Sequence, residues 1–353
     1  MDRWKAIGLR VLGLCLYRVG LFLLLTRWVD RVQKKSTETH ALSFPCVQKR
    51  TLNPVQILMY HGISDAWSPF LPTEPIELFR NHLQYLSTYC NVLTLDEATE
   101  RMKCRDVPNR AVVITIDDGY RDSYLNAFPL LREMGLPATV FLATVCTGSE
   151  SLLWHDRACW MISHTTVPSL EGYGSQARYE LTTPEAKRAA QAGVLWYLRS
   201  LEDRERIQAL EQLSEILGLP EDPKLDSRLM LNWQEVEEMY KGGVQFGAHT
   251  VNHPILSKLP LSSVIDEVRK SKDMIEQNLG ARVTTFAYPS GRPEDYNQEI
   301  KDIVKQEGFS CAVSTVRGQN YEGDDLFDLK RMGYWDHDSG VFGLRFEYTR
   351  FCV

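Results

Sequence analysis

The chain has 353 residues, of which 44% are hydrophobic and 24% are charged, so it is long enough to bury a full core. Its formal net charge of −6 argues against nucleic acid as the partner. The charge is uneven: residues 1–35 hold eight Lys or Arg against two Asp, which gives +6 there and leaves −12 for the remainder.

The apolar stretch at residues 11–26 is interrupted by Arg18 and flanked by Arg10 and Arg27. A helix spanning a bilayer would place Arg18 near its middle, at a cost of about 2.5–3.5 kcal/mol. A basic, Leu-rich helix that lies on the membrane surface avoids this cost. We therefore expect peripheral membrane contact through residues 1–30. There are two alternatives. The helix could pack on the body of the protein, or it could be a spanning or signal-anchor helix.

The cysteines are dispersed and none forms a CxxC pair, which excludes a zinc ribbon and a thioredoxin motif. We expect reduced, packed thiols rather than a disulfide framework, and hence a reducing compartment. Together with the N-terminal segment, this predicts a cytoplasmic or membrane-peripheral protein rather than a secreted one. The eight positions are Cys15, Cys46, Cys90, Cys104, Cys146, Cys159, Cys311 and Cys352.

From residue 53 onward, short apolar runs alternate with amphipathic segments of about ten residues, which is typical of a parallel sheet with crossover helices. The predicted strands are residues 55–60, 91–95, 112–116, 138–142, 243–248, 284–288 and 309–314. The predicted helices are residues 76–88, a helix opening at 96, 124–134, a capping-box helix from 232 to about 241, 263–279 and 298–307.

Residues 150–228 break this rhythm, because they contain a Trp-rich stretch and a charged helical region at 184–217 but no strand pattern. We interpret them as a helical insertion or lid. The predicted organisation is an N-terminal basic helix and linker at 1–52, followed by one α/β unit at 53–345 that carries the insertion.

Polar groups follow several of the predicted strands, at the carboxyl edge where α/β folds collect ligands. They are Tyr60-His61, Asp117-Asp118-Gly119, His249 with His253, and Tyr288-Pro289-Ser290-Gly291. Alone, the Asp pair is compatible with an ordinary strand-end turn, and the two His with solvated or core residues. Their coincidence at one edge favours a site.

Two adjacent carboxylates at the end of a buried strand are costly unless a metal or protons compensate them. One Asp and two His four residues apart are the ligand set of a catalytic zinc-type site that keeps a position open for water. The second Asp is then free to act as a base. The sequence therefore predicts a metal-dependent hydrolase.

The segments ITIDDGYRDSYLNAFPLLREMGLPATVFLAT, FGAHTVNHP and FAYPSG resemble the successive motifs of the polysaccharide deacetylase family, the NodB-homology group of carbohydrate esterases. LMYHGIS and VLTLDEA resemble the branch with poly-N-acetylglucosamine deacetylases. The resemblance covers about residues 55–335. It implies a distorted (β/α) barrel of about seven strands and removal of N-acetyl groups from acetamido sugars.

Carried over to this chain, the resemblance implies that Asp117 is the general base and that Asp118, His249 and His253 hold the metal. Zn²⁺ is expected, with Co²⁺, Ni²⁺ or Mn²⁺ as alternatives. We expect a backbone N–H of the 288–291 loop to stabilise the oxyanion, because Pro289 fixes the turn and Gly291 permits close approach.

The general acid is expected to be His61, with His337 as the alternative. The family frequently has an Arg where this chain has Ala287, and Arg292, Arg121 or Arg331 could take its role. Tyr60, Tyr288, Pro289, Ser290, Gly291 and Trp154 are the candidate substrate-binding residues. Trp154 and Trp160 could equally pack the insertion, and His155 beside them is the helical His most compatible with a substrate cleft.

We therefore expect an N-deacetylase acting on an acetamido sugar of a polysaccharide or a lipid-linked glycan. An amidase for peptidoglycan or a small non-sugar amide is the second hypothesis, and a non-catalytic glycan-binding relative the third. The intact Asp117, Asp118, His249 and His253 argue against the third, since a binding protein has no use for a base beside a metal.

Overall fold

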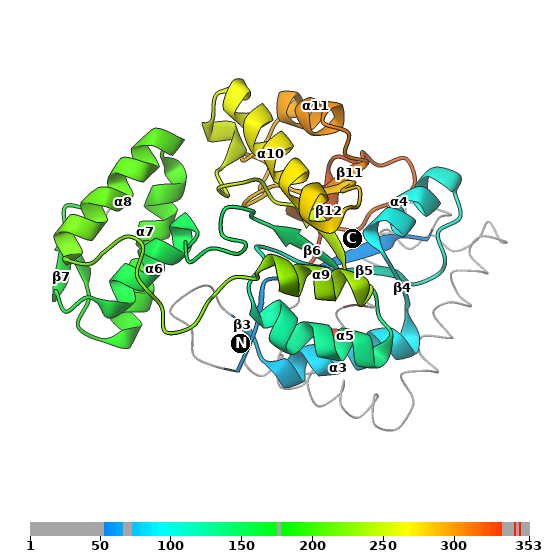
Figure 1. Ribbon diagram of the computed structural model, residues 1–353, viewed down its shortest axis with the longest axis horizontal. Helices are drawn as coiled ribbons and strands as arrows, with labels where there is room; N and C mark the ends of the chain where they lie inside the picture. The colour runs from blue at the N-terminus through cyan, green and yellow to red at the C-terminus, as the bar shows by residue number, and fades with distance from the viewer. Residues whose placement is uncertain (1–52, 66–72, 175–177, 334–341, 344–345, 347–353) are drawn as a thin grey trace, which may run out of the picture.

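The computed structural model describes residues 53–65, 73–174, 178–333, 342, 343 and 346 (Figure 1). The predicted N-terminal helix and linker at 1–52 and the candidate acid His337 lie outside these residues. Within the described part, no helix combines the length and the apolar character needed to cross a membrane. The five described cysteines are free thiols, of which Cys146, Cys159 and Cys311 are buried and Cys104 is exposed.

Seven strands of the described chain form a nearly closed parallel barrel, so the predicted barrel is confirmed. The barrel closes through hydrogen bonds from Met59 N to Met332 O (3.0 Å) and from Met332 N to Ile57 O (2.8 Å). A further strand, β4 (Asn91–Leu93), pairs with the first half of β5. In barrel order the seven are β1 (Val55–Tyr60), β5 (Ala111–Ile116), β6 (Thr139–Leu142), β9 (Gln245–Ala248), β10 (Thr285–Ala287), β11 (Cys311–Arg317) and β12 (Leu329–Arg331).

Helices surround the sheet (Figure 1), and several of them begin or end at capping residues. Asn232 and Glu235 form the predicted capping box, with Glu235 N donating to Asn232 Oδ1 at 2.7 Å, and Gly280 ends its helix in the left-handed conformation. The helices are α3 (Ile76–Tyr89), α4 (Leu95–Cys104), α5 (Phe128–Met134), α9 (Trp233–Lys241), α10 (Leu261–Leu279) and α11 (Gln298–Gln306). A π-helical turn at Ser123–Ala127, a 3₁₀ turn at Leu256–Lys258 and the short pair β2 (Gly62–Ile63) and β3 (Thr73–Glu74) complete the connections.

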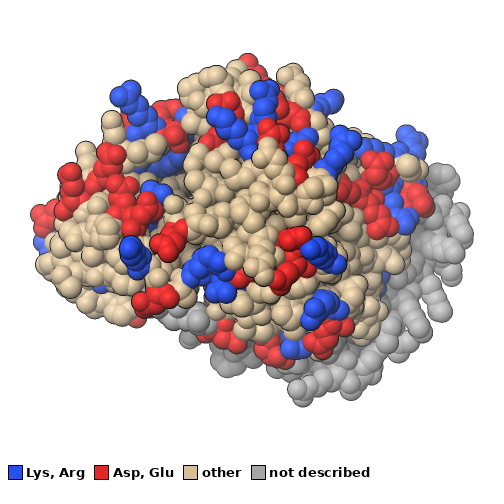
Figure 2. Space-filling view, viewed as in Figure 1, with Lys and Arg blue, Asp and Glu red and all other residues tan. Residues whose placement is uncertain are grey.

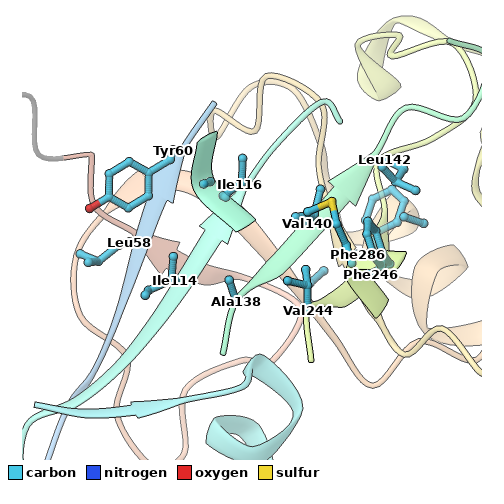
Figure 3. Packing of buried hydrophobic residues seen from close by; sticks show 14 of the residues in the cluster. Leu58, Tyr60, Ile114, Ile116, Ala138, Val140, Leu142, Val244, Phe246 and Phe286 are labelled. Carbon is cyan, nitrogen blue, oxygen red and sulfur yellow. The ribbon is translucent and has the colours of Figure 1, made fainter. Parts of the chain in front are cut away.

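Side chains alternate between two faces of each strand, and this alternation decides what reaches the barrel interior. Leu58, Ile114, Ile116 and Val140 belong to the core shared with the helices (Figure 3). The intervening Ile57, Val113, Phe141 and Val313 belong to a separate core cluster with Leu329. Asp117 follows Ile116 and has the same parity along the chain as Val113 and Thr115. Its side chain therefore points to the barrel interior, on the side of the cluster that contains Val113.

The insertion is a lobe beside the barrel with its own hydrophobic core (Figure 1). It is not free of strands as predicted, because Leu170 and Tyr179 sit opposite each other in an antiparallel pair. That pair has three residues a strand with only the middle one buried, which is too short to give a sequence pattern. Its elements are α6 (Trp154–His164), β7 (Ser169–Glu171), β8 (Arg178–Glu180), α7 (Pro184–Ser200) and α8 (Asp203–Leu217).

Charged side chains are interspersed over the face of the molecule drawn in Figure 2. Lys and Arg lie beside Asp and Glu on the insertion as well as on the barrel helices, and an apolar or neutral surface lies between them. On this face, neither sign of charge is segregated onto one element.

Candidate active site

Asp117 and Asp118 lie where β5 ends, and their backbone turns sharply to separate the two carboxylates. Asp118 has φ 72° and Gly119 has φ 82°, both in the left-handed region. A non-Gly residue there stores about 1–3 kcal/mol of strain, which Asp tolerates better than most side chains. Asp117 therefore keeps the direction of the strand while Asp118 is aimed away from it.

Asp118, His249 and His253 come together as a buried group that could hold a metal ion. The Oδ1 atom of Asp118 lies 3.5 Å from His249 Nε2 and 3.3 Å from His253 Nε2, and the three ligand atoms all lie within 4.8 Å of one another. This Oδ1 is buried, yet it finds no hydrogen-bond partner among the described residues. A buried acceptor facing two imidazole nitrogens fits a cation between them.

The backbone around the two His supports this arrangement. The Nδ1 atom of His249 is 2.7 Å from Ala287 O, so this nitrogen carries the proton and leaves the Nε2 lone pair for an ion. His253 has φ 54° and Thr250 has φ 66°, and the Thr250 hydroxyl accepts from His253 N at 3.1 Å. Burial lowers the pKa of His253, which favours the neutral form that a metal ligand needs.

Asp117 is held by a guanidinium inside the barrel. Arg331, which is 1% exposed, donates to both carboxylate oxygens at 2.7 Å, and its Nε donates to Ser314 O at 2.7 Å. Burial alone would raise the pKa of Asp117, but the charge and hydrogen bonds of Arg331 outweigh it and hold this pKa below 3.8. Of the three Arg considered from the sequence, Arg331 is the one bound to Asp117. Arg121 pairs with Glu235 and Arg292 with Glu294.

The model of a protein family, described as polysaccharide deacetylase, matches residues 105–312. The chain belongs to the polysaccharide deacetylase family. YxkH of Bacillus subtilis, named for this family, is 23% identical over 304 residues, which cover 86% of this chain and 77% of YxkH. The poly-β-1,6-N-acetyl-D-glucosamine N-deacetylase of Staphylococcus epidermidis is 36% identical over 74 residues, 21% of this chain and 26% of that protein.

The fold is likewise shared with a solved deacetylase. PplD of Streptococcus pyogenes, determined in complex with acetate, superposes with a TM-score of 0.56 at 21% identity, over 83% of this chain and 97% of PplD. The fold shared with this deacetylase thus extends over more of the chain than the segment that the family model matches.

His61 joins the site, whereas the tyrosines predicted beside it point elsewhere. His61 Nε2 lies 3.9 Å from Asp117 Oδ2, and the side chain of His61 is 27% exposed. Tyr60 points to the opposite face of β1, where its hydroxyl lies 3.1 Å from His82 Nδ1 and its ring packs on Phe79 (Figure 3). Alternation along the strand already predicts this, because Tyr60 has the parity of the outward Leu58.

Tyr288 is excluded from the site for the same reason. It shares the parity of Phe286, stacks on Tyr296 and donates its hydroxyl to Phe327 O at 2.9 Å. Pro289 is buried, and Ser290 and Gly291 follow it with φ near 60°. The amide of Gly291 donates to Pro289 O at 2.7 Å, so this N–H is engaged in the turn rather than aimed at a substrate.

The insertion reaches the site through Trp154 and His155, which the sequence offered as cleft candidates, and through Asp156, which it did not. Trp154, proposed to contact substrate, is half-buried and donates its Nε1 proton to the backbone oxygen of His253 at 2.9 Å. His155 is buried, with Nε2 3.2 Å from the Tyr120 hydroxyl, and burial lowers its pKa to about 3. No local pattern marks Asp156, because its partner Tyr120 lies 36 residues away in the sequence.

Proposed function

We propose that this protein is a metal-dependent N-deacetylase that removes acetyl groups from acetamido sugars of a polysaccharide or lipid-linked glycan. One observation carries the proposal: Asp117, unprotonated and fixed by Arg331, lies beside the buried Asp118, His249 and His253 group. Membership in the polysaccharide deacetylase family supports it, as does the local similarity to a poly-N-acetylglucosamine N-deacetylase.

Asp118, His249 and His253 would hold a divalent ion, and Zn²⁺ suits two imidazoles and a carboxylate best, with Co²⁺, Ni²⁺ and Mn²⁺ as alternatives. When bound, such an ion supplies Lewis-acid polarisation of the acetamide carbonyl and a water of lowered pKa. The chain supplies the proton transfers. Asp117 is ionised at neutral pH because its pKa is lowered, so it accepts the proton of the attacking water.

The leaving sugar amine needs a proton, and the position of His61 supports this residue as the donor. Its Nε2 is 3.9 Å from Asp117 Oδ2 and its side chain is part-exposed, so it borders both the base and the solvent from which a glycan approaches. An imidazole also has the ordinary pKa nearest neutrality. His337 remains the alternative acid and lies outside the described residues.

The test is acetate release from N-acetylglucosamine oligomers by protein reconstituted with Zn²⁺, alongside Asp117→Asn and His61→Gln. His164→Gln is the matched control, because His164 is exposed at the end of α6. We expect Asp117→Asn to lose release while its metal content is unchanged, and His164→Gln to match the wild type. Release that survives in Asp117→Asn contradicts the assignment of the base. A metal-loaded wild type that releases no acetate contradicts the proposed substrate and favours an amidase for peptidoglycan or a non-sugar amide.

We also propose that residues 1–30 hold the protein at a membrane surface, on the basis of their Leu-rich and basic sequence. Flotation of the full chain with anionic liposomes, compared with a chain that starts at residue 52, tests this. Equal flotation of the two contradicts membrane contact through this segment.

A further inference from the structure

Three consecutive residues of the insertion, Trp154, His155 and Asp156, open helix α6 directly against the candidate metal site. Asp156 is fully buried and His155 is 6% exposed, although both are polar and both lie in a segment outside the barrel. Buried polar groups are held by specific partners, and here the partners lead to two of the three proposed metal ligands.

The contact from Trp154 fixes the backbone of His253. Its indole N–H donates to His253 O at 2.9 Å, across 99 residues of sequence. His253 has a left-handed backbone, so its carbonyl cannot be satisfied by continuing a regular element. On the other side, the guanidinium of Arg206 from α8 lies 4.9 Å from the Trp154 ring centroid, which holds the indole in place.

The contact from His155 restrains the ring of His253. The two ring centroids are 5.0 Å apart with the planes at 70°, while His249 lies against the same ring at 4.7 Å and 75°. His253 thus contacts two imidazoles, one from the barrel and one from the insertion. These contacts restrain the ring whose Nε2 lies 3.3 Å from Asp118 Oδ1.

Asp156 is connected through Tyr120 to the loop that carries Asp118. The Tyr120 hydroxyl lies 3.1 Å from both carboxyl oxygens of Asp156, and His155 Nε2 reaches the same hydroxyl at 3.2 Å. Because the phenol donates to Asp156, His155 donates to the phenol oxygen. Tyr120 stands two residues after Asp118, in the turn that gives Asp118 its left-handed backbone, so this network fixes the end of that turn.

We propose that helix α6 is a working part of the metal centre: Trp154 and His155 are positioning residues for His253, and Asp156, through Tyr120, positions the loop of Asp118. The insertion is anchored beyond His253 as well, since Arg199 of α7 pairs with Asp295, whose backbone oxygen accepts from Ser257 N at 2.9 Å. The segment from His253 to Ser257 therefore lies between two attachments of the insertion. The affinity for the ion therefore depends on contacts from the insertion as well as on the barrel residues.

The test measures ion binding directly, because this role presupposes the metal site of the proposed function. Zn²⁺ affinity is determined by competition with a chromophoric chelator, and the visible spectrum of the Co²⁺-loaded protein reports ligand geometry. Trp154→Phe keeps the ring and removes the N–H. Its matched control is Trp160→Phe on the same helix, whose ring stacks on His164. We expect roughly 10–100-fold weaker Zn²⁺ binding and a changed Co²⁺ spectrum in Trp154→Phe, and neither in Trp160→Phe.

Tyr120→Phe tests the contact between Asp156 and the Asp118 loop, with Tyr179→Phe as its control. The Tyr179 hydroxyl is buried in the insertion without a hydrogen-bond partner among the described residues, so its removal breaks no such contact. We expect weaker Zn²⁺ binding in Tyr120→Phe and no change in Tyr179→Phe. We also expect Asp156→Ala to bind Zn²⁺ more weakly than Asp156→Asn, whose amide oxygen can still accept from the Tyr120 hydroxyl. A wild type that binds Zn²⁺ while Trp154→Phe and Tyr120→Phe bind it equally well overturns the inference. A wild type that binds no ion overturns the proposed metal site itself.

Discussion

Asp117 is a buried carboxylate whose ionised form depends on Arg331. Its burial favours the neutral acid, and the two 2.7 Å hydrogen bonds with the guanidinium reverse that preference. Since the pKa is lowered in the folded protein, this pair stabilises the fold above pH 3.8, and the contribution is lost as the pH falls through the folded pKa. The pair keeps the proposed base ionised across the neutral range.

Arg331→Leu should therefore change both stability and pH dependence. We expect a loss of about 3–5 kcal/mol in the free energy of unfolding at pH 7, because an unpaired charge remains buried. The pKa of Asp117 should rise, since only the charges of His249 and His61 then oppose the effect of burial, and the acidic limb of the kcat/KM profile should move to higher pH. Urea unfolding at pH 5 and 7 and the pH–rate profile measure this. Arg292→Leu, which removes an exposed pairing at 3.9 Å, is the control, and equal stability of the two variants would contradict the role of Arg331.

The pKa of Asp122 is shifted in the opposite direction from that of Asp117. Burial raises its pKa to about 6, and although Ile63 N donates to its Oδ2 at 3.0 Å, its Oδ1 is buried without a partner among the described residues. A raised carboxyl pKa means that the folded state binds the proton more tightly than the unfolded state. Stability is then lost as the pH rises from about 4 through about 6.

Asp122→Asn should consequently stabilise the protein in neutral solution and not in acid. A shift of roughly two pKa units corresponds to about 3 kcal/mol, reduced by any hydrogen bond that the amide fails to reproduce. We expect a higher unfolding midpoint than the wild type at pH 8 and little difference near pH 4. Asp302→Asn, on the exposed side of α11, should leave both midpoints unchanged. A gain for Asp122→Asn of equal size at both pH values would show that ionisation is not its cause.

At the scale of the strand, β9 shows how backbone space is used to build the site. Gly247 pairs with Phe141 of β6, and a Cβ there would lie 2.5 Å from both Phe141 Cε1 and Thr285 Oγ1. The Phe141 ring in turn lies under the Arg331 guanidinium, 5.9 Å from its centroid. The absent side chain of Gly247 leaves room for the ring on which the partner of Asp117 rests.

Gly247→Ala should disturb the contact between Phe141 and Arg331 by displacing the Phe141 ring on the neighbouring strand. We expect a loss of about 1–3 kcal/mol, the usual cost of overpacking, and a lower kcat from displacement of Arg331. Gly318→Ala is the matched control, because its Cβ would meet the flexible side chain of Lys330 instead. Denaturant unfolding and steady-state kinetics distinguish them. If both variants lose stability equally, crowding against Phe141 is not the cause.

The sequence predicted the strands with apolar runs, but not the one that closes the barrel. β12 has three residues, of which Lys330 is exposed, and its partner β1 begins 274 residues earlier. Arg331 was therefore one of three Arg candidates, because the choice depends on barrel closure rather than on any local pattern. The ligand group was predictable because each part lies within one short motif. Alternation along β1 and β10 could also have placed Tyr60 and Tyr288 outside the site.

At the scale of the whole molecule, two loops of the barrel and helix α6 of the insertion meet at the candidate metal site. Asp118 follows β5, His249 and His253 follow β9, and α6 contacts both loops from the insertion. An ion that binds these ligands in the folded protein, and not in the unfolded chain, must stabilise the whole assembly by mass action. Metal binding and folding are thus coupled.

Removal and return of the ion should show this coupling in the unfolding temperature. Zn²⁺ at about 100 times its dissociation constant adds about 2.7 kcal/mol, which for a chain of this size raises Tm by roughly 3–5 °C over the chelator-treated protein. His249→Ala should show no such rise, whereas His164→Ala, at the exposed end of α6, should show all of it. Differential scanning calorimetry at several Zn²⁺ concentrations measures the dependence. A rise of equal size in His249→Ala would mean that the ion binds elsewhere, because the imidazole that Ala287 O orients would then contribute nothing to holding it.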